Sequence, residues 1–501
     1  MLYQSTRGSK PVSAAEAIIA GLAPNGGLYL PQNFPVFTEE EIQTLCQLTY
    51  NERAAKVMAK FLSGYTESEL ADVCGKAYSY VKFPVKGTAP VVELHEDVSI
   101  LELFHGPTCA FKDFALQVMP YLLMAALKKC GVRKEVVILV ATSGDTGKAA
   151  LTGFSDVPGT RICVFYPAGG VSPIQELQMV SQEGSNVMVF GVNGNFDDAQ
   201  TGVKQIFTDT ALVNSLGEQG FLLSSANSIN WGRMVPQVVY YFSAYCDLLN
   251  ANKITMGSPV DFIVPTGNFG NIFSAYLAKQ CGLPIGTLVC ASNKNKVLTD
   301  FFNTGTYDRR RDFYLTSSPA MDILISSNLE RLLYLLLSRD PNELASLMNM
   351  LSSNGVYTVD DSIKRMLKKV FFAGFADDAA TDETIRRVFE TTGYLCDTHT
   401  AVALNVFEQY KNVTQSKNHA VIASTANPFK FGKSVLQAIE GSVKGSEFEQ
   451  FDRLCKRSGV KAPESLTSLQ TAKVRFRTML EKDGMKQAVA EWLNQKQGVF
   501  A

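Results

Sequence analysis

The chain has 501 residues, which at about 150 residues per domain is enough for roughly three domains and a large buried core. Its 47 Lys and Arg residues nearly balance 48 Asp and Glu residues, and a net charge of −1 gives no overall field that would attract nucleic acid or an anionic membrane. Hydrophobic residues make up 46% and charged residues 19%, a composition that excludes a disordered chain. The ten cysteines include no Cys-x-x-Cys pair and there are only four histidines, so we expect reduced thiols and no metal site.

The first eight residues become polar within a few positions and lack the apolar run of a secretory signal. The longest apolar stretches, such as residues 332–337, are far shorter than a membrane span. We therefore expect a cytoplasmic protein without membrane or nucleic-acid partners, present as a monomer or small homo-oligomer.

The predicted secondary structure changes along the chain. Residues 1–95 show loose helical periodicity, and the acidic run 39–41 is typical of a helix N-terminus. Strands followed by helical patterns are expected at 136–141, 161–166, 186–192, 221–225, 261–265, 287–291 and 419–426. Residues 318–415 and the tail from about 445 are again mainly helical. This alternation predicts a parallel, doubly wound α/β sheet, in which ligands bind at the carboxyl ends of the strands.

The first candidate site segment contains Phe104-His105-Gly106-Pro107-Thr108 followed by Phe111-Lys112-Asp113. Apolar residues recur at helical spacing as far as Leu122, which places Lys112 in or near the first turn of a helix. At the positive end of the helix dipole and between two phenylalanines, the ammonium form of Lys112 is disfavoured, as Schiff-base chemistry requires. The alternative is a lysine that reaches solvent beside Asp113.

The second segment, Ala141–Lys148, follows a strand and opens a helix, where backbone N–H groups form an anion site for a carboxylate or phosphate. It is not a Walker P-loop, because that motif needs glycine at Thr142 and Ser or Thr at Ala149. The alternative is a plain strand-to-helix turn capped by Ser143 or Asp145.

The third segment, Pro265–Asn271, also lies between a strand and a helix. Its two glycines, Gly267 and Gly270, allow the backbone to approach a phosphate closely. The segment lacks the GxGxxG pattern of a dinucleotide fold, and its size suits a single phosphate monoester.

The fourth segment, Ala423–Pro428, ends the last predicted strand with small hydroxyl residues that can meet a ring nitrogen. The alternative is a strand that breaks into an Asn-Pro turn. Together the four segments offer an activated lysine, a carboxylate-binding turn, a monophosphate cup and a hydroxyl group. That combination is what pyridoxal 5′-phosphate requires.

At these motifs the sequence resembles threonine synthase, a family of the fold type II pyridoxal-phosphate enzymes, over nearly the whole chain. The matching motifs are Tyr3 with Ser5-Thr6-Arg7-Gly8, Asn25–Pro31, Phe104–Thr108 with Phe111–Asp113, Ser143–Gly147, Asn230-Trp231-Gly232-Arg233 and Gly267–Asn271. The chain departs from the family at Thr398, which replaces the proline before His399, and at Asn427, where many members carry histidine.

The resemblance implies two doubly wound parallel-sheet subdomains and a mainly helical N-terminal domain. It places the N-terminal domain at 1–95, the cofactor-binding core at 96–440 with a smaller subdomain at about 130–240, and a C-terminal helical segment at 441–501.

The resemblance also implies a role for each candidate residue. Lys112 would hold the cofactor and act as general base; Gly267, Asn268, Phe269, Gly270 and Asn271 would hold the cofactor phosphate; Thr425 would meet the ring nitrogen; Ser143, Asp145 and Thr146 would bind the substrate carboxylate; and Arg233 with Asn230 would bind the substrate phosphate. His105 and His399 either line the site or are structural.

The implied reaction converts O-phospho-L-homoserine and water to L-threonine and phosphate, the last step of threonine biosynthesis. The nearest rival is a phospholyase that gives 2-oxobutyrate and ammonia from the same substrate. A nucleotide-dependent phosphotransferase that uses residues 143–148 is disfavoured by the broken Walker pattern, and a cofactor-binding protein without turnover is disfavoured by the presence of Lys112 and Arg233.

Overall fold

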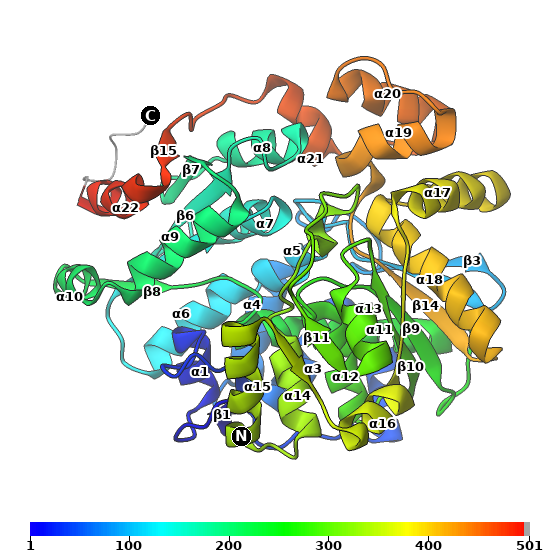
Figure 1. Cartoon of the computed structure of the whole chain (residues 1–501), viewed down its shortest axis with the longest axis horizontal. Helices are drawn as coiled ribbons and strands as arrows, with labels where there is room; N and C mark the ends of the chain where they lie inside the picture. The colour runs from blue at the N-terminus through cyan, green and yellow to red at the C-terminus, as the bar shows by residue number, and fades with distance from the viewer. Residues whose placement is uncertain (495–501) are drawn as a thin grey trace.

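Two separate parallel sheets carry the buried strands of the chain, as Figure 1 shows for a computed structural model that describes residues 1–494. The larger sheet has the strand order β13-β10-β9-β14-β4-β3. Its strands are β3 (Val91–His95), β4 (Val98–Glu102), β9 (Val260–Pro265), β10 (Ile285–Ser292), β13 (Phe371–Phe375) and β14 (His419–Ser424). All are parallel except the edge strand β3, which runs antiparallel to β4.

The smaller sheet is parallel throughout and has the order β15-β7-β6-β5-β8. Its strands are β5 (Glu135–Ala141), β6 (Thr160–Pro167), β7 (Val187–Asn193), β8 (Phe221–Ser224) and β15 (Met479–Glu481). The apolar runs of β5 and β6 are buried because helices cover both faces of a parallel sheet. The expectation of two parallel α/β sheets is confirmed.

The N-terminal part of the chain is mainly helical, as predicted. It contains β1 (Tyr3–Ser5), α1 (Ala14–Ala20), β2 (Tyr29–Pro31), α2 (Glu39–Cys46), α3 (Tyr50–Phe61) and α4 (Glu67–Ala77). Thr38 caps α2 through a capping box with Glu41, which places the acidic run at the helix start. The motif at the start of the chain anchors this part to the core, because Thr6 and Arg7 both bind the Glu330 carboxylate, at 2.6 Å and 2.8 Å.

Helices cover both sheets. Those of the first half of the core are α5 (Lys112–Leu116), α6 (Met119–Lys129), α7 (Asp145–Phe154), α8 (Pro173–Val180), α9 (Phe196–Thr208), α10 (Thr210–Glu218), α11 (Trp231–Asn250) and α12 (Gly270–Gln280). Those of the second half are α13 (Val297–Thr304), α14 (Leu329–Leu336), α15 (Pro341–Asn354), α16 (Asp361–Val370), α17 (Asp378–Thr392), α18 (Thr398–Thr414) and α19 (Gly432–Glu440), with the short pair β11 (Thr306–Asp308) and β12 (Val356–Thr358). Long α18 packs across β9, β10 and β14.

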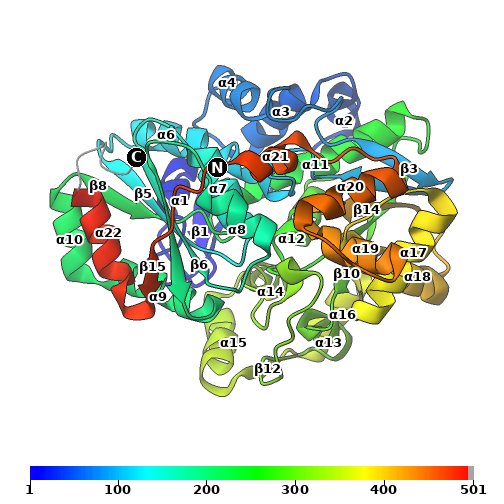
Figure 2. The same ribbon diagram turned by 90° about the horizontal axis from the view of Figure 1, so that it is seen from above.

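The C-terminal tail differs from its prediction as a helical segment. Besides α20 (Glu447–Ser458), α21 (Glu464–Thr467) and α22 (Met485–Asn494) it contributes β15, which pairs with β7. Figure 2 shows this tail crossing from α20, which packs against α19, to α22 beside α9. A three-residue strand that completes a distant sheet has too little periodicity to be recognised locally. The predicted segment also includes residues 495–501, which lie outside the described residues.

The sequence analysis also missed β3, β4 and β13. In β3 the side chains are half-buried or exposed, so no continuous apolar run marks this edge strand. Within residues 1–494 there is no helix with the length and apolar character needed to cross a membrane.

Candidate active site

Three of the four predicted motifs follow neighbouring strands of the larger sheet. The lysine segment follows β4, the hydroxyl segment follows β14, and the glycine loop follows β9, and these strands lie side by side in the order β9-β14-β4. The N–H group of Phe111 donates to the carbonyl oxygen of Thr425 at 2.9 Å, which joins two of the segments directly. The carboxyl edge of one sheet therefore assembles the lysine, the hydroxyl group and the glycine loop.

The fourth motif comes from the smaller sheet. It follows β5 and opens α7, and its Asp145 carboxylate meets the Lys112 ammonium group at 3.3 Å. Since α5 also packs against α7, the two sheets bring all four segments to one site.

Lys112 is the first residue of α5, in the predicted first turn, and its side chain is 12% exposed. Burial lowers its pKa, and the positive charges of Lys430 and Arg233 act in the same direction, while Asp145 opposes them. Its partner is Asp145 rather than the adjacent Asp113. The expected single helix is divided in two, because α5 ends at Leu116 and α6 begins at Met119.

Asp113, next to Lys112 in the chain, holds the preceding turn in place. Its buried carboxylate accepts hydrogen bonds from the N–H and hydroxyl groups of Thr108, at 2.8 Å and 2.7 Å. A Cβ atom on Gly106 would lie 2.5 Å from this carboxylate. The Gly106-Pro107-Thr108 turn is thus fixed by Asp113, and it presents the lysine that follows.

Asp145 is buried and faces cations. Its carboxylate accepts hydrogen bonds from Lys430 at 2.6 Å and Gln175 at 2.9 Å, in addition to Lys112. Burial by itself would raise the pKa of Asp145, but the lysines, Lys430 foremost, hold it well below its usual range. A charged carboxylate is not a donor for an anionic substrate group, so the Asp145 side chain balances lysine charge. The predicted contact of Asp145 with the substrate carboxylate stays a prediction for its N–H group, which lies in the first turn of α7.

The turn before α7 is capped by a residue that sequence reasoning did not single out. The Thr142 hydroxyl oxygen accepts hydrogen bonds from the N–H groups of Gly144, at 3.0 Å, and Gly147, at 2.9 Å. Gly144 has φ of 134°, and a Cβ atom there would lie 2.5 Å from the Gln175 amide. Ser143 is left exposed and Thr146 half-buried at the helix start, where first-turn N–H groups lack acceptors within the helix.

The glycine loop has an unusual backbone at a residue other than glycine. Phe269 lies in the left-handed region, with φ of 62°, and precedes the first residue of α12, Gly270. Asn271 accepts hydrogen bonds from the hydroxyl groups of Tyr240 and Tyr241, while its amide nitrogen is buried without a partner among the described residues. That free donor suits a ligand oxygen at this loop.

A segment that the sequence analysis did not implicate closes over the glycine loop. Residues 316–328, called the strap below, approach it through Ser326, whose hydroxyl donates to the Gly267 carbonyl at 2.7 Å, and through Asn328, whose N–H donates to the Asn268 carbonyl at 3.1 Å. A Cβ atom on Gly267 would lie 2.6 Å from the Ala320 carbonyl oxygen. The glycine at 267 is therefore needed because protein backbone passes directly over it.

His399 tethers the strap. Its Nε2 atom accepts a hydrogen bond from the Ala320 N–H at 3.2 Å, and its Nδ1 atom pairs with Asp397 at 2.8 Å. A ring nitrogen that accepts from backbone N–H requires the proton on Nδ1, so this arrangement favours the structural interpretation of His399. Thr398, the departure from the family pattern, donates to the Ser317 carbonyl at 2.7 Å and adds a second tether.

Arg233 lies in the first turn of α11 and is buried. Its guanidinium donates to the Ala226 carbonyl at 2.8 Å, whereas its Nε atom has no partner among the described residues. Burial lowers its pKa to about 10, and no carboxylate within residues 1–494 forms an ion pair with it. A buried arginine with a free donor is suited to an anionic ligand.

Asn230 caps the same helix. Its side-chain oxygen accepts from the Gly232 N–H at 2.8 Å, and its amide donates to the carbonyl groups of Ile18 and Ser225 at 3.0 Å and 3.3 Å. With its donors used by the protein, it fits a structural cap better than the predicted contact with a substrate phosphate.

Two further residues complete the site. Thr425 is 5% exposed at the end of β14. Asn427 caps the short helix Pro428–Phe431 by accepting from the Phe429 N–H at 3.0 Å, and this helix presents Lys430 to Asp145. The Asn-Pro turn at 427–428 was visible in the sequence, but nothing local indicated that the lysine after it would be buried.

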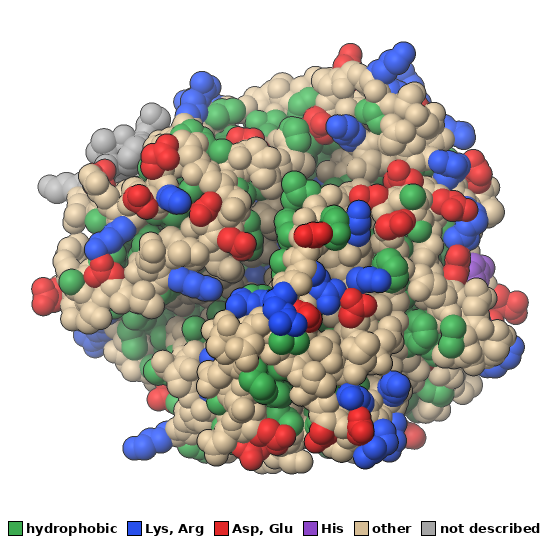
Figure 3. Space-filling model, viewed as in Figure 1, with side chains coloured by type: hydrophobic (Ala, Val, Ile, Leu, Met, Phe, Trp, Pro, Cys, Tyr) green, Lys and Arg blue, Asp and Glu red, His purple; other side chains and the backbone are tan. Residues whose placement is uncertain are grey.

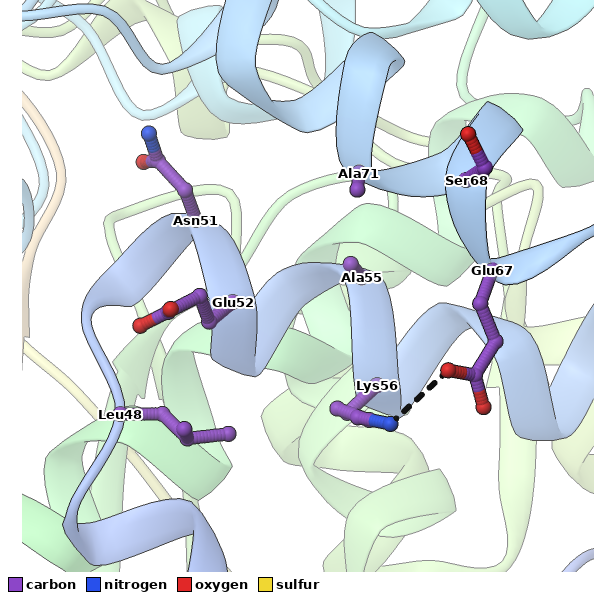
Figure 4. A pocket seen from close by; sticks show the side chains of 8 residues that line it. All are labelled: Leu48, Asn51, Glu52, Ala55, Lys56, Glu67, Ser68 and Ala71. Carbon is purple, nitrogen blue, oxygen red and sulfur yellow. Dashed lines mark hydrogen bonds and ion pairs between the residues drawn. The ribbon is translucent and has the colours of Figure 1, made fainter.

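A cavity of about 360 Å³ lies elsewhere, between α3 and α4, beside the ion pair of Lys56 and Glu67 (Figure 4). None of the predicted site residues lines it, so it does not compete with the strand-end site.

The residues at the strand ends fit pyridoxal phosphate. A lysine with a lowered pKa can hold its aldehyde, and the free Asn271 donor of the glycine loop suits its phosphate. The hydroxyl side chain of Thr425 follows β14, the strand between β9 and β4. Fold and site together define a pyridoxal-phosphate-dependent enzyme of fold type II. Residues 86–425 match the family model for pyridoxal-phosphate dependent enzymes, residues 2–78 that for the threonine synthase N terminus, and residues 400–489 that for the threonine synthase C-terminal part. The chain belongs to the threonine synthase family.

Known proteins match most of this chain. Threonine synthase of Saccharomyces cerevisiae is 36% identical over 98% of both chains, and that of Pseudomonas aeruginosa is 39% identical over 87% of this chain and 90% of its own. Human threonine synthase-like 1 is 41% identical, but the match spans only 58% of its length.

Solved structures agree. The pyridoxal-phosphate-bound threonine synthase of Brucella melitensis matches with a TM-score of 0.86 and 37% identity, and the yeast threonine synthase with 0.87 and 34%, each over 98% of both chains. The predicted family, fold class and cofactor are confirmed.

Proposed function

We propose that the chain is a threonine synthase that converts O-phospho-L-homoserine and water to L-threonine and phosphate. The observation that carries this proposal is Arg233, a buried cation with a free donor that lies near enough to Lys112 to influence its charge. A substrate that brings its own phosphate to the site would supply the missing counter-charge. Figure 3 shows Lys and Arg side chains near the middle of the face drawn, with Asp and Glu side chains beside them.

Two anion sites orient this substrate. The turn from Ser143 to Thr146 offers helix N-terminal N–H groups and hydroxyl groups to the substrate carboxylate. Arg233 offers its guanidinium fork to the phosphate at the other end of the substrate. A molecule with a carboxylate and a phosphate at opposite ends satisfies both groups.

The chemistry supplied by bound pyridoxal phosphate is an aldehyde that holds the substrate amine and a conjugated ring that accepts electrons from the α-carbon. Lys112 takes the proton from Cα, since burial favours its neutral form. Thr425 provides a neutral hydroxyl group to the ring nitrogen, so this chain does not hold that nitrogen protonated with a carboxylate. Arg233 holds the phosphate while it leaves Cγ and a proton leaves Cβ. Cγ then takes up a proton, water adds its hydroxyl group at Cβ while its remaining proton goes to the released phosphate, and the proton taken by Lys112 returns to Cα.

The test is the product formed in isotopically labelled water. Incubation of the purified holoenzyme with O-phosphohomoserine in ¹⁸O-water is expected to release phosphate and threonine in equal amounts, with solvent oxygen on Cβ. The Lys112→Ala variant serves as control and should form neither product. Release of phosphate together with 2-oxobutyrate and ammonia would instead identify a phospholyase.

A further inference from the structure

Lys430 is a buried lysine in contact with the site but outside the four motifs. Its side chain is 0% exposed, and its ammonium group donates to the Asp145 carboxylate at 2.6 Å and to the Thr108 carbonyl at 3.0 Å. Burial of an ammonium group is costly unless the charge is paired and hydrogen-bonded, so this geometry needs Asp145 to remain a carboxylate.

The two lysines contact the Asp145 carboxylate through different oxygen atoms and at different distances. Lys430 binds the Oδ1 atom, which Gln175 also reaches, whereas Lys112 reaches only Oδ2 and at the longer distance of 3.3 Å. One carboxylate can balance one ammonium group. The shorter contact and complete burial of Lys430 make it the lysine that is balanced.

We propose that Lys430 is a positioning residue. By forming the main ion pair with Asp145, it leaves the Lys112 amine free for the cofactor and for proton transfer. The inference rests on the proposed role of Lys112. Without Lys430, the Asp145 carboxylate would have Lys112 as its only lysine partner and would stabilise the ammonium form of Lys112. An ammonium ion is neither a nucleophile nor a base.

Other charged groups also face the two lysines. Arg233, from α11, influences Lys112, and its positive charge disfavours the ammonium form. Asp113 and Lys148 lie near enough to Lys430 to be influenced by its charge. Asp113 is engaged by Thr108 and Lys148 by Gln182, so neither replaces Asp145 as the shared partner.

The experiment measures the titration of Lys112 itself. The full chain, freed of cofactor, is labelled with a trace of acetic anhydride at a series of pH values, and acetylation of Lys112 is read by peptide mass spectrometry. Exposed Lys417 in the same digest is the internal standard. The variants are Lys430→Gln, Asp145→Asn, and the double variant, with Lys430→Arg as the charge-conserving control.

Each variant has an expected direction. Lys430→Gln should raise the Lys112 pKa by about one unit or more, a tenfold or greater fall in labelling near neutral pH. Asp145→Asn should lower this pKa, the double variant should return it toward the wild-type value, and Lys430→Arg should change it little. A merely structural role for Lys430 would not produce these opposite signs.

An unchanged Lys112 pKa in Lys430→Gln, or a pKa in the double variant that is no higher than in Asp145→Asn, overturns the inference. If Lys430→Gln does not fold, the second comparison is made with Lys430→Met in the Asp145→Asn background. Failure of the proposed role of Lys112 gives a different result: borohydride reduction of the holoenzyme would then fix the pyridoxyl group on a peptide without Lys112.

Discussion

Two loops of the site each connect a strand to the helix that follows it, but they are held in place by different contacts. The loop Gly267–Asn271 connects β9 to the first turn of α12, and the turn Thr142–Gly147 connects β5 to the first turn of α7. The first is held from outside, by the strap that binds its carbonyl groups and passes over Gly267. The second is held from within, by the Thr142 hydroxyl, and leaves Ser143 exposed. A covered loop suits a cofactor that stays, and an open turn suits a substrate that enters and leaves.

The largest effect is expected for substitution of Arg233, which tests whether this residue binds the substrate phosphate or supports the cofactor loop Gly267–Asn271. We expect Arg233→Leu to reduce the preference for O-phosphohomoserine over homoserine by roughly two orders of magnitude, because a buried charge-assisted contact is worth a few kcal/mol. The measurement is kcat/KM for both compounds at saturating cofactor. Arg233→Lys, which keeps the charge without the fork, should retain part of the preference.

If Arg233→Leu instead weakens cofactor retention and lowers the two kcat/KM values equally, Arg233 serves the covered loop, and the substrate phosphate is bound elsewhere.

The covered loop itself is tested by a matched pair of glycines. Gly267→Ala should weaken cofactor retention about tenfold or more, since its Cβ atom would lie 2.6 Å from the Ala320 carbonyl and overpacking of this kind costs ~1–3 kcal/mol. At Gly270 the nearest atom to such a Cβ is 3.5 Å away, in the flexible Asn328 side chain, so Gly270→Ala should be tolerated. Titration of the apo variants with pyridoxal phosphate measures both.

Equal retention in the two glycine variants would show that the strap yields to a methyl group and that the loop is less firmly covered than its contacts indicate.

The smallest effect is expected at the open turn. Ser143→Ala should raise KM for O-phosphohomoserine roughly three- to tenfold, the value of one hydrogen bond, and leave cofactor affinity unchanged. Thr146→Val should behave alike if both hydroxyl groups meet the substrate carboxylate. Steady-state kinetics with cofactor titration checks this, and a loss of cofactor affinity in either variant would argue against separate duties for the two loops.

Local patterns were sufficient for much of the fold. The apolar run at Val136–Ala141, the acidic run 39–41 at the start of α2, and the glycine-containing loops after β5 and β9 are properties of short stretches of chain, and each appears where expected. The first-turn position of Lys112 was predictable for the same reason, because helical spacing is encoded within one or two turns.

The remainder depends on contacts between segments far apart in the chain. Asp145 and Lys430 are 285 residues apart in the chain. Asp145 follows β5 of the smaller sheet and Lys430 follows β14 of the larger sheet, so their ion pair forms only where the two sheets meet. Long-range packing, which no local pattern records, also puts the strap over Gly267 and binds the Asn230 amide to the Ile18 carbonyl, 212 residues away in the chain. Residue types and turns thus follow from local chemistry, whereas which charges are balanced, which loop is covered and which donors stay free follow from long-range packing.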